Sequence, residues 1–232
     1  MGYIIVFEGT DGSGKQVQST KLFERLQAEG FNVMKHSFPS YESPTSTLVK
    51  MYLNGELCKE AKDLDAYKTS VLFSVDRLCT YQMKLKQFYE SGGIIVLDRY
   101  VQSNMLHQGG KIADLNERHK FINWLEEFEF GYLGLPRPNQ TIFLDMPPKY
   151  SQMLASSRKE LKDQGEKDIQ EQNSQHIIDS YNAGKQVADE QKWKVVNCVR
   201  NGEIRAIDDI HSEVYETVIS KLSAYLVDKS DR

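Results

Sequence analysis

The sequence predicts a three-layer α/β/α fold built on a five-stranded, mostly parallel sheet. Five short segments have the length of strands, and the first of them, residues 3–7, is a continuous apolar run typical of a buried parallel strand. Helical stretches separate these segments, and such alternation is typical of a sheet covered by helices on both faces. The chain has 232 residues, of which 40% are hydrophobic and 27% charged. We therefore expect one globular domain over residues 1–232.

The first half of the chain holds three of the expected strands. Residues 3–7 form an apolar run that ends at a glycine-rich turn. Residues 15–29 place Leu22 and Leu26 among charged residues, as in an amphipathic helix, and Gly30 marks its end. The elements expected next are a strand at 31–36, a proline-containing loop at 37–46, a short helix at 48–53, a long helical stretch at 67–89 and a strand at 94–97.

The second half continues the alternation of strands and helices. The expected elements are helices at 117–130 and 151–157 flanking a strand at 141–144, a strongly polar segment at 158–174, a helix at 176–191, a fifth strand at 194–198 and a terminal helix at 207–226. In parallel sheets of this kind, ligands bind beyond the carboxyl ends of the strands. We therefore expect the functional site at the residues that directly follow the first four strands.

Charge and composition argue against several classes of protein. The net charge is −4 and the isoelectric point about 5.8, which disfavours a nucleic-acid-binding surface. No apolar run approaches the ~20 residues of a transmembrane helix, and the N-terminus does not resemble a secretory signal. Cys58, Cys79 and Cys198 are far apart and odd in number, which favours free thiols in a reducing compartment. We expect a cytoplasmic protein with neither membrane nor nucleic acid as a partner.

The glycine-rich turn after the first strand carries a phosphate-binding pattern. Its glycines allow a loop whose N–H groups point inward at phosphate oxygens, and the following helix directs its positive N-terminus at the same place. A lysine at the end of the pattern reaches the β- and γ-phosphates. The residues expected to bind the ATP phosphates are Gly9, Thr10, Asp11, Gly12, Ser13, Gly14, Lys15 and Gln16. A strand before and a helix after the pattern favour a true P-loop over a chance glycine-rich turn.

Gln16 departs from the P-loop pattern at its last position. Serine or threonine usually stands there, and its hydroxyl binds Mg²⁺. The amide oxygen of Gln16 could reach the ion or one of its waters, or phosphates and carboxylates could hold the metal instead. The sequence thus predicts nucleotide binding and leaves the exact magnesium site open.

An acidic and a basic residue stand side by side after the third strand. Asp98 has no second acidic neighbour, where hydrolytic ATPases usually carry the glutamate that activates water, and the guanine-specific [NT]KxD motif is absent. The Asp98 carboxylate can organise Mg²⁺, directly or through water, and the Arg99 guanidinium can fork onto the phosphate of an acceptor. These features favour a kinase over a GTPase switch or an ATPase.

Three segments in this order resemble the thymidylate kinase family. They are residues 7–15 (FEGTDGSGK) with Gln18, residues 72–77 (LFSVDR), and residues 98–104 (DRYVQSN) followed by Gln108. The resemblance runs from residue 3 to about residue 199. It implies a P-loop NTPase fold, a homodimer, and transfer of the γ-phosphoryl group of Mg–ATP to dTMP, giving dTDP for dTTP synthesis.

The resemblance also implies roles for residues on the acceptor side. Asp11 would face the sugar and its 3′-hydroxyl, and Arg99 would hold the phosphate. Phe73 would stack on the thymine ring, Arg77 would donate to O4, and Asn104 would contact N3. Without the resemblance, Phe73 would be a core residue and Arg77 a solvated charge. The full set implied to bind dTMP is Asp11, Phe38, Pro39, Leu53, Phe73, Arg77, Arg99, Ser103, Asn104 and Gln108.

The residues implied to act in catalysis are Lys15, Asp98, Arg99 and Arg158. Arg158 opens the 158–174 segment, which corresponds to a lid over ATP, and lysines stand where the family has further lid arginines. The chain also lacks the arginine that often follows the Phe38-Pro39 pair. His107 stands in place of a tyrosine that can discourage a ribose 2′-hydroxyl.

Two alternatives remain open at the level of the sequence. One is another P-loop nucleoside monophosphate or deoxynucleoside kinase, and a deoxynucleoside kinase would need a carboxylate base for its neutral hydroxyl acceptor. The other is a non-catalytic nucleotide-binding protein, for which Gln16 and the altered lid are the best support. An acceptor phosphate with a second pKa of about 6 is mostly dianionic at neutral pH, so transfer to dTMP needs no general base.

Overall fold

The computed structural model describes residues 1–161 and 174–230. Its centre is a five-stranded sheet in the order β2-β3-β1-β4-β5, in which every pair of neighbouring strands is parallel. The expected five-stranded, mostly parallel sheet is therefore confirmed. The strands are β1 (Tyr3–Glu8), β2 (Val33–Ser37), β3 (Ile94–Asp98), β4 (Gln140–Asp145) and β5 (Lys194–Asn197).

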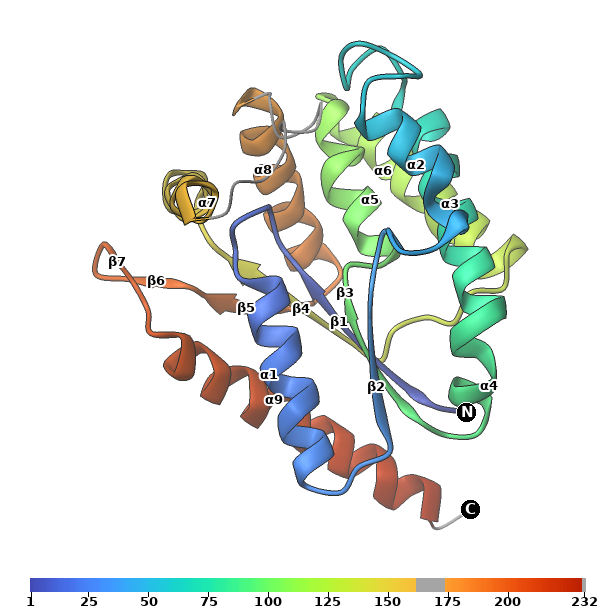
Figure 1. Cartoon of the computed structure of the whole chain (residues 1–232), viewed down its shortest axis with the longest axis vertical. Helices are drawn as coiled ribbons and strands as arrows, with labels where there is room; N and C mark the ends of the chain where they lie inside the picture. Colours follow the sequence, from blue (N-terminus) through green and yellow to red (C-terminus); the bar gives the residue numbers. More distant parts are fainter. Residues whose placement is uncertain (162–173, 231–232) are drawn as a thin grey trace.

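Helices cover both faces of this sheet and complete the three expected layers (Figure 1). α1 and α9 pack on one face, whereas α3, α5, α6 and α8 lie on the other. The helices are α1 (Lys15–Ala28), α2 (Thr47–Leu53), α3 (Ala66–Thr80), α4 (Lys86–Glu90), α5 (Val101–His107), α6 (Leu115–Glu126), α7 (Pro148–Leu161), α8 (Ser174–Glu190) and α9 (Ile207–Ser230).

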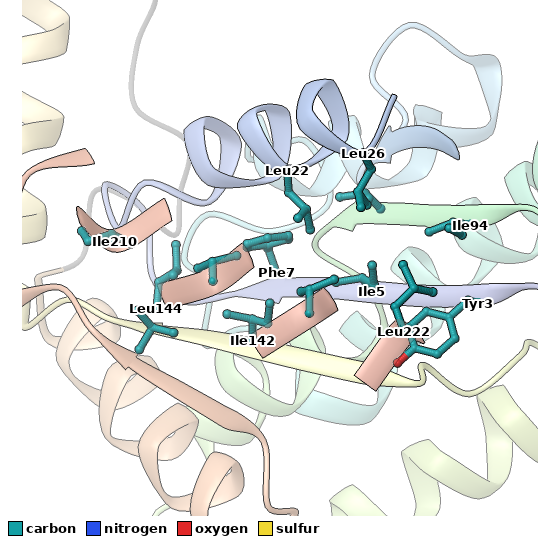
Figure 2. Packing of buried hydrophobic residues seen from close by; sticks show 14 of the residues in the cluster. Tyr3, Ile5, Phe7, Leu22, Leu26, Ile94, Ile142, Leu144, Ile210 and Leu222 are labelled. Carbon is teal, nitrogen blue, oxygen red and sulfur yellow. The ribbon is translucent and has the colours of Figure 1, made fainter. Parts of the chain in front are cut away.

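The core divides at the sheet because successive side chains of a strand point to opposite faces. Tyr3, Ile5 and Phe7 of β1 pack with Leu22 of α1 and Leu222 of α9 (Figure 2). The intervening residues of β1 belong to the cluster on the other face. Burying β1 on both faces, at roughly 1.5–3 kcal/mol for each large apolar side chain, fixes the glycine-rich turn that follows it.

Several elements differ from those that the sequence predicted. α5 was not expected, because its residues Gln102, Ser103 and Asn104 are polar although they are buried. The long stretch at 67–89 divides into α3, a π-helical turn (Tyr81–Leu85) and α4. A hairpin of β6 (Val199–Arg200) and β7 (Glu203–Ile204) was also missed. Its turn is Asn-Gly with positive φ at both residues, which is a strong hairpin signal.

The polar segment at 158–174 meets α7 at one end and α8 at the other. Arg158 belongs to α7, but its side chain and residues 162–173 lie outside the described residues. The lid at 158–174 thus stays a prediction. Among the described residues, no helix is both long and apolar enough to cross a membrane. The cytoplasmic location also stays a prediction.

Candidate active site

A cavity of about 350 Å³ lies at the carboxyl edge of the sheet, where β1, β2 and β3 end. The glycine-rich turn, the loop after β2, α3 and α5 all contribute to its wall. Its lining residues are Asp11, Gln16, Ser37, Phe38, Pro39, Tyr41, Leu53, Phe73, Asp76, Arg77, Asp98, Arg99, Tyr100, Ser103, Asn104, His107 and Gln108. The structure thus brings together every residue that the resemblance implied to bind dTMP.

The glycine-rich turn joins β1 to α1 and leaves the N-terminus of that helix open. Gly12 has a φ of 82°, and a Cβ on it would lie 2.2 Å from the carbonyl oxygen of Ser151 in α7, so only glycine fits there. Gly14 precedes α1 with a φ of 93°, and no described side chain caps this helix. The first N–H groups of α1 are therefore available to phosphate oxygens.

The polar side chains of this turn also fit a phosphate group. Lys15 Nζ donates to the carbonyl oxygens of Gly9 at 2.8 Å and Thr10 at 2.9 Å. Burial, together with Arg99, lowers the pKa of Lys15 to about 8. The buried hydroxyls of Thr10 and Ser13 have no hydrogen-bond partner among the described residues. A phosphate would give the two hydroxyls an acceptor and would favour the charged lysine.

Arg99 lies opposite the turn and faces it. One Nη of its guanidinium forms an ion pair with Asp11, and the other contacts Nε2 of His107 at 3.0 Å. Burial and the nearby guanidinium hold the pKa of His107 well below its usual range, so the ring is neutral and can accept this hydrogen bond. Burial alone would raise the pKa of Asp11, but Arg99 and Lys15 outweigh it and hold that pKa well below its usual range.

Glu8 is a site residue that the sequence analysis missed. Its carboxylate accepts hydrogen bonds from the Tyr100 N–H at 3.0 Å and from Ser103 Oγ at 2.8 Å. Burial raises its pKa to about 7, although Arg99 opposes this shift. Glu8 thereby fixes the start of α5 to the end of β1. A carboxylate at the end of an otherwise apolar buried strand was the signal that could have revealed it.

α2 and α3 contribute apolar residues to one part of the cavity wall, which we call its apolar end. Phe73 of α3 and Leu53 of α2 line it, and Tyr52 packs edge-on against the Phe73 ring with centroids 6.1 Å apart. The amide nitrogen of Asn104 donates to the Ser70 carbonyl oxygen at 3.4 Å. An aromatic face beside a fixed amide suits a flat, hydrogen-bonding ring.

Arg77 borders this apolar end but is neither solvated nor unpaired. It is 2% exposed and forms an ion pair with Glu129, which is fully buried. The alternative of a solvated charge is therefore wrong. Glu129 lies 52 residues away in sequence, and nothing in the spacing of the motifs indicated this partner.

The loop after β2 uses its hydroxyls for its own structure. Ser40 Oγ lies 2.8 Å from both His36 Nε2 and Thr80 Oγ1, and the Ser40 N–H donates to Asp76 at 2.8 Å. Tyr41, in contrast, lines the cavity. Ser40 is thus committed to holding the Phe38-Pro39 segment in place.

The oxygen-bearing residues beside the turn fit a magnesium ion that arrives with ATP. Asp98 and Gln16 both line the cavity, and carboxylate and amide oxygens are the ligand types that Mg²⁺ takes from proteins. In residues 1–161 and 174–230, no group of three or more His, Cys, Asp or Glu side chains could hold a metal alone. Phosphate oxygens and water would complete the coordination of an ion that arrives with ATP.

Comparisons with known proteins agree with this geometry. A family model described as thymidylate kinase matches residues 7–208. A thymidylate kinase from Plasmodium falciparum (isolate 3D7) is 28% identical over 217 residues, which cover 94% of this chain and 90% of that protein. A thymidylate kinase from Caenorhabditis elegans is 26% identical over 226 residues, covering 94% and 91% of the two chains.

A third relative matches over a shorter segment. The thymidylate kinase of Mycobacterium tuberculosis (strain ATCC 25618 / H37Rv) is 30% identical over 142 residues, which cover 61% of this chain and 64% of that protein. The family model spans most of the chain and includes both the glycine-rich turn and the Asp98–Arg99 pair. The chain therefore belongs to the thymidylate kinase family of phosphotransferases.

Proposed function

We propose that this protein transfers the γ-phosphoryl group of ATP to dTMP and so produces dTDP for dTTP synthesis. One observation carries the proposal: a single cavity is lined both by Asp11 and Arg99, at the glycine-rich turn, and by Phe73 and Arg77 of α3. A protein that only sensed ATP would need the turn but not a second pocket for a flat ring.

The donor side is the glycine-rich turn. The N–H groups at the start of α1 and Lys15 bind the β- and γ-phosphates, because both present positive charge where these oxygens collect. A magnesium ion bound with ATP would supply positive charge that neutralises the phosphate oxygens. Asp98 and Gln16, which line the same cavity, would hold the ion or its waters.

The acceptor side is Arg99. In the structure its guanidinium pairs with Asp11 and His107, and the dianionic phosphate of dTMP competes for the same donors. Once Arg99 turns to this phosphate, Asp11 is released to accept a hydrogen bond from the 3′-hydroxyl of the sugar. The acceptor oxygen is already anionic, so positioning and charge neutralisation are sufficient for transfer.

The base would lie at the apolar end of the cavity. Phe73 stacks on the ring, while Arg77 and Asn104 contact its polar edge, and Phe38, Pro39 and Leu53 surround the 5-methyl group. Ser103 and Gln108 complete the wall. Closure of the 158–174 segment would bring Arg158 to the transferred group and exclude water, which protects ATP from hydrolysis.

A panel of acceptors with Mg–ATP tests this function. We expect turnover of dTMP to exceed that of dUMP, dCMP and AMP, and we expect no turnover of thymidine, because thymidine lacks the phosphate that Arg99 holds. Formation of dTDP and ADP is measured by ion-exchange chromatography. ATP binding without turnover of any acceptor would contradict the proposal, and so would a preference for thymidine.

We also propose that the protein forms a homodimer through α3. Tyr67, Val71 and Val75 stand at intervals of four along this helix and are 37–38% exposed. Residues at this spacing share one helix face, so α3 presents a continuous apolar stripe beside the walls of the cavity. Such exposed apolar patches mark interaction surfaces.

A further inference from the structure

A buried ion pair includes Arg77, one of the residues that line the cavity. It joins Arg77 of α3 to Glu129 of the π-helical turn Glu127–Tyr132. Nε of Arg77 donates to one carboxylate oxygen of Glu129 at 2.7 Å, and Nη2 donates to the other. Ser74 Oγ also donates to Glu129, at 2.8 Å. Both carboxylate oxygens are thus satisfied by groups on one helix.

The geometry of this pair fixes the direction of the guanidinium. Glu129 occupies the Nε–Nη2 side of the planar fork, and Nη1 makes a 3.4 Å contact with the Tyr100 carbonyl oxygen. A guanidinium has five N–H groups, so two of them, on Nη1 and Nη2, have no partner among the described residues. These two groups are at the outer end of the side chain, and Arg77 lines the cavity.

We propose that Glu129 is a positioning residue that sets the selectivity for the acceptor base. By holding one side of Arg77, it presents the two outer N–H groups to the cavity as fixed donors. A base with a carbonyl oxygen at this place is accepted, and a base with an amino group is rejected. This inference rests on the proposed function, because it assumes that a nucleoside monophosphate occupies the cavity.

Fixed donors discriminate more strongly than mobile ones. An unrestrained arginine can rotate away from a mismatched group, but Arg77 is held on one side by Glu129 and is almost fully buried. An amino group would then meet N–H groups that can only donate, and buried donors left unpaired reject the wrong ligand strongly. Thymine and 5-methylcytosine share the 5-methyl group and differ at position 4 and at N3, which carries a hydrogen only in thymine. Asn104, which would contact N3, is the same in the wild type and in the Glu129 variants, so a change of the acceptor ratio between them reports on Arg77.

The test compares dTMP with 5-methyl-dCMP in the Glu129→Gln variant. We expect the KM for dTMP to rise about tenfold or more, with the KM for ATP within twofold of the wild type. The ratio of kcat/KM for dTMP to that for 5-methyl-dCMP should fall at least tenfold, because one side of the fork loses its charged partner. The matched control is Glu127→Gln, an exposed residue in the same turn, which should change none of these quantities.

Further variants separate positioning from folding. Glu129→Asp keeps the buried charge but withdraws the carboxylate, and it should lower the dTMP preference in the same direction. In an Arg77→Met background, Glu129→Met should restore thermal stability, because it removes an unpaired carboxylate. The remaining preference for dTMP over 5-methyl-dCMP should stay within twofold of that of Arg77→Met alone. A purely structural role would instead reduce kcat/KM for both acceptors equally.

The outcomes assign failure to one proposal or the other. Suppose that the wild-type protein phosphorylates dTMP, and that every folded variant among Glu129→Gln and Glu129→Asp keeps the wild-type ratio of kcat/KM for dTMP to that for 5-methyl-dCMP. The inference about Glu129 is then overturned, while the proposed function stands. If neither Glu129→Gln nor Glu129→Asp folds, the Arg77→Met variant is compared with the Arg77→Met/Glu129→Met double variant. A base preference that differs more than twofold between these two proteins overturns the inference, because Glu129 would then act without Arg77. A wild-type protein that phosphorylates no nucleoside monophosphate would overturn the proposed function itself.

Discussion

Arg99 adopts an unusual backbone conformation at the centre of the site. Its φ is 69°, in the left-handed region that residues other than glycine rarely occupy, at a cost of about 1–3 kcal/mol. Hydrogen bonds from the Arg99 N–H to the Phe7 carbonyl oxygen and from the Tyr100 N–H to Glu8 hold the peptides on both sides. The buried strand β1 thus imposes the conformation that directs the guanidinium toward the glycine-rich turn.

Replacing Arg99 by alanine should remove most of the activity and leave the fold intact. We expect kcat/KM for dTMP to fall by about 10²–10³, the usual loss when one charge-stabilising donor is removed. Arg99→Lys should recover only part of it, because an ammonium lacks the planar fork. Steady-state kinetics measure both variants. The ion pair with Asp11 is partly exposed and contributes little stability, so circular dichroism should show an unchanged fold. Near-normal turnover by Arg99→Ala would contradict the role of Arg99.

At the scale of elements, the site depends on the close approach of α7 to the glycine-rich turn. The turn leaves β1 and enters α1, both of which are held by the core. Ser151, near the start of α7, lies directly against Gly12. Gly14, in the same turn, has open space where its Cβ would be. The two glycines therefore meet different constraints although both have positive φ.

This difference predicts unequal effects of two alanine substitutions. Both alanines must adopt the left-handed conformation, which costs roughly 1–2 kcal/mol. Gly12→Ala must in addition displace the Ser151 backbone, so its melting temperature should fall at least about 4 °C below that of Gly14→Ala. Its KM for ATP should also rise more, because α7 and the turn move apart. Equal melting temperatures in scanning calorimetry would show that α7 does not press on the turn.

At the scale of the whole molecule, the apolar stripe on α3 is the expected dimer contact. Introducing two charges with Val71→Glu and Val75→Glu should convert the dimer to a monomer, because buried unpaired carboxylates are strongly unfavourable. Light scattering coupled to size-exclusion chromatography measures the mass. The matched control is Leu226→Glu, an equally exposed apolar residue on α9 at the opposite face of the sheet. A wild-type monomer, or a dimer that survives both charges, would contradict this contact.

Much of the fold could be predicted because its signals are local. The sequence indicated all five strands of the sheet. The central strands β1, β3 and β4 are buried throughout and mostly apolar, as strands covered on both faces are, whereas the edge strands β2 and β5 are only partly buried. α5 carried no such signal, because Gln102, Ser103 and Asn104 are buried by neighbours distant in sequence. The hairpin at Asn201-Gly202 did carry a local signal and was overlooked.

The sequence by itself determined the glycine-rich turn between β1 and α1, the Asp98–Arg99 pair and the family, because each depends on residues adjacent along the chain. Only the tertiary structure decided that Glu129 pairs with Arg77, that Glu8 holds the start of α5, and that Asp11 and His107 bind the Arg99 guanidinium. The physical reason is that a buried charge takes whichever partner the packing of the elements brings within hydrogen-bonding distance. For Arg77 that partner lies on another helix, 52 residues away.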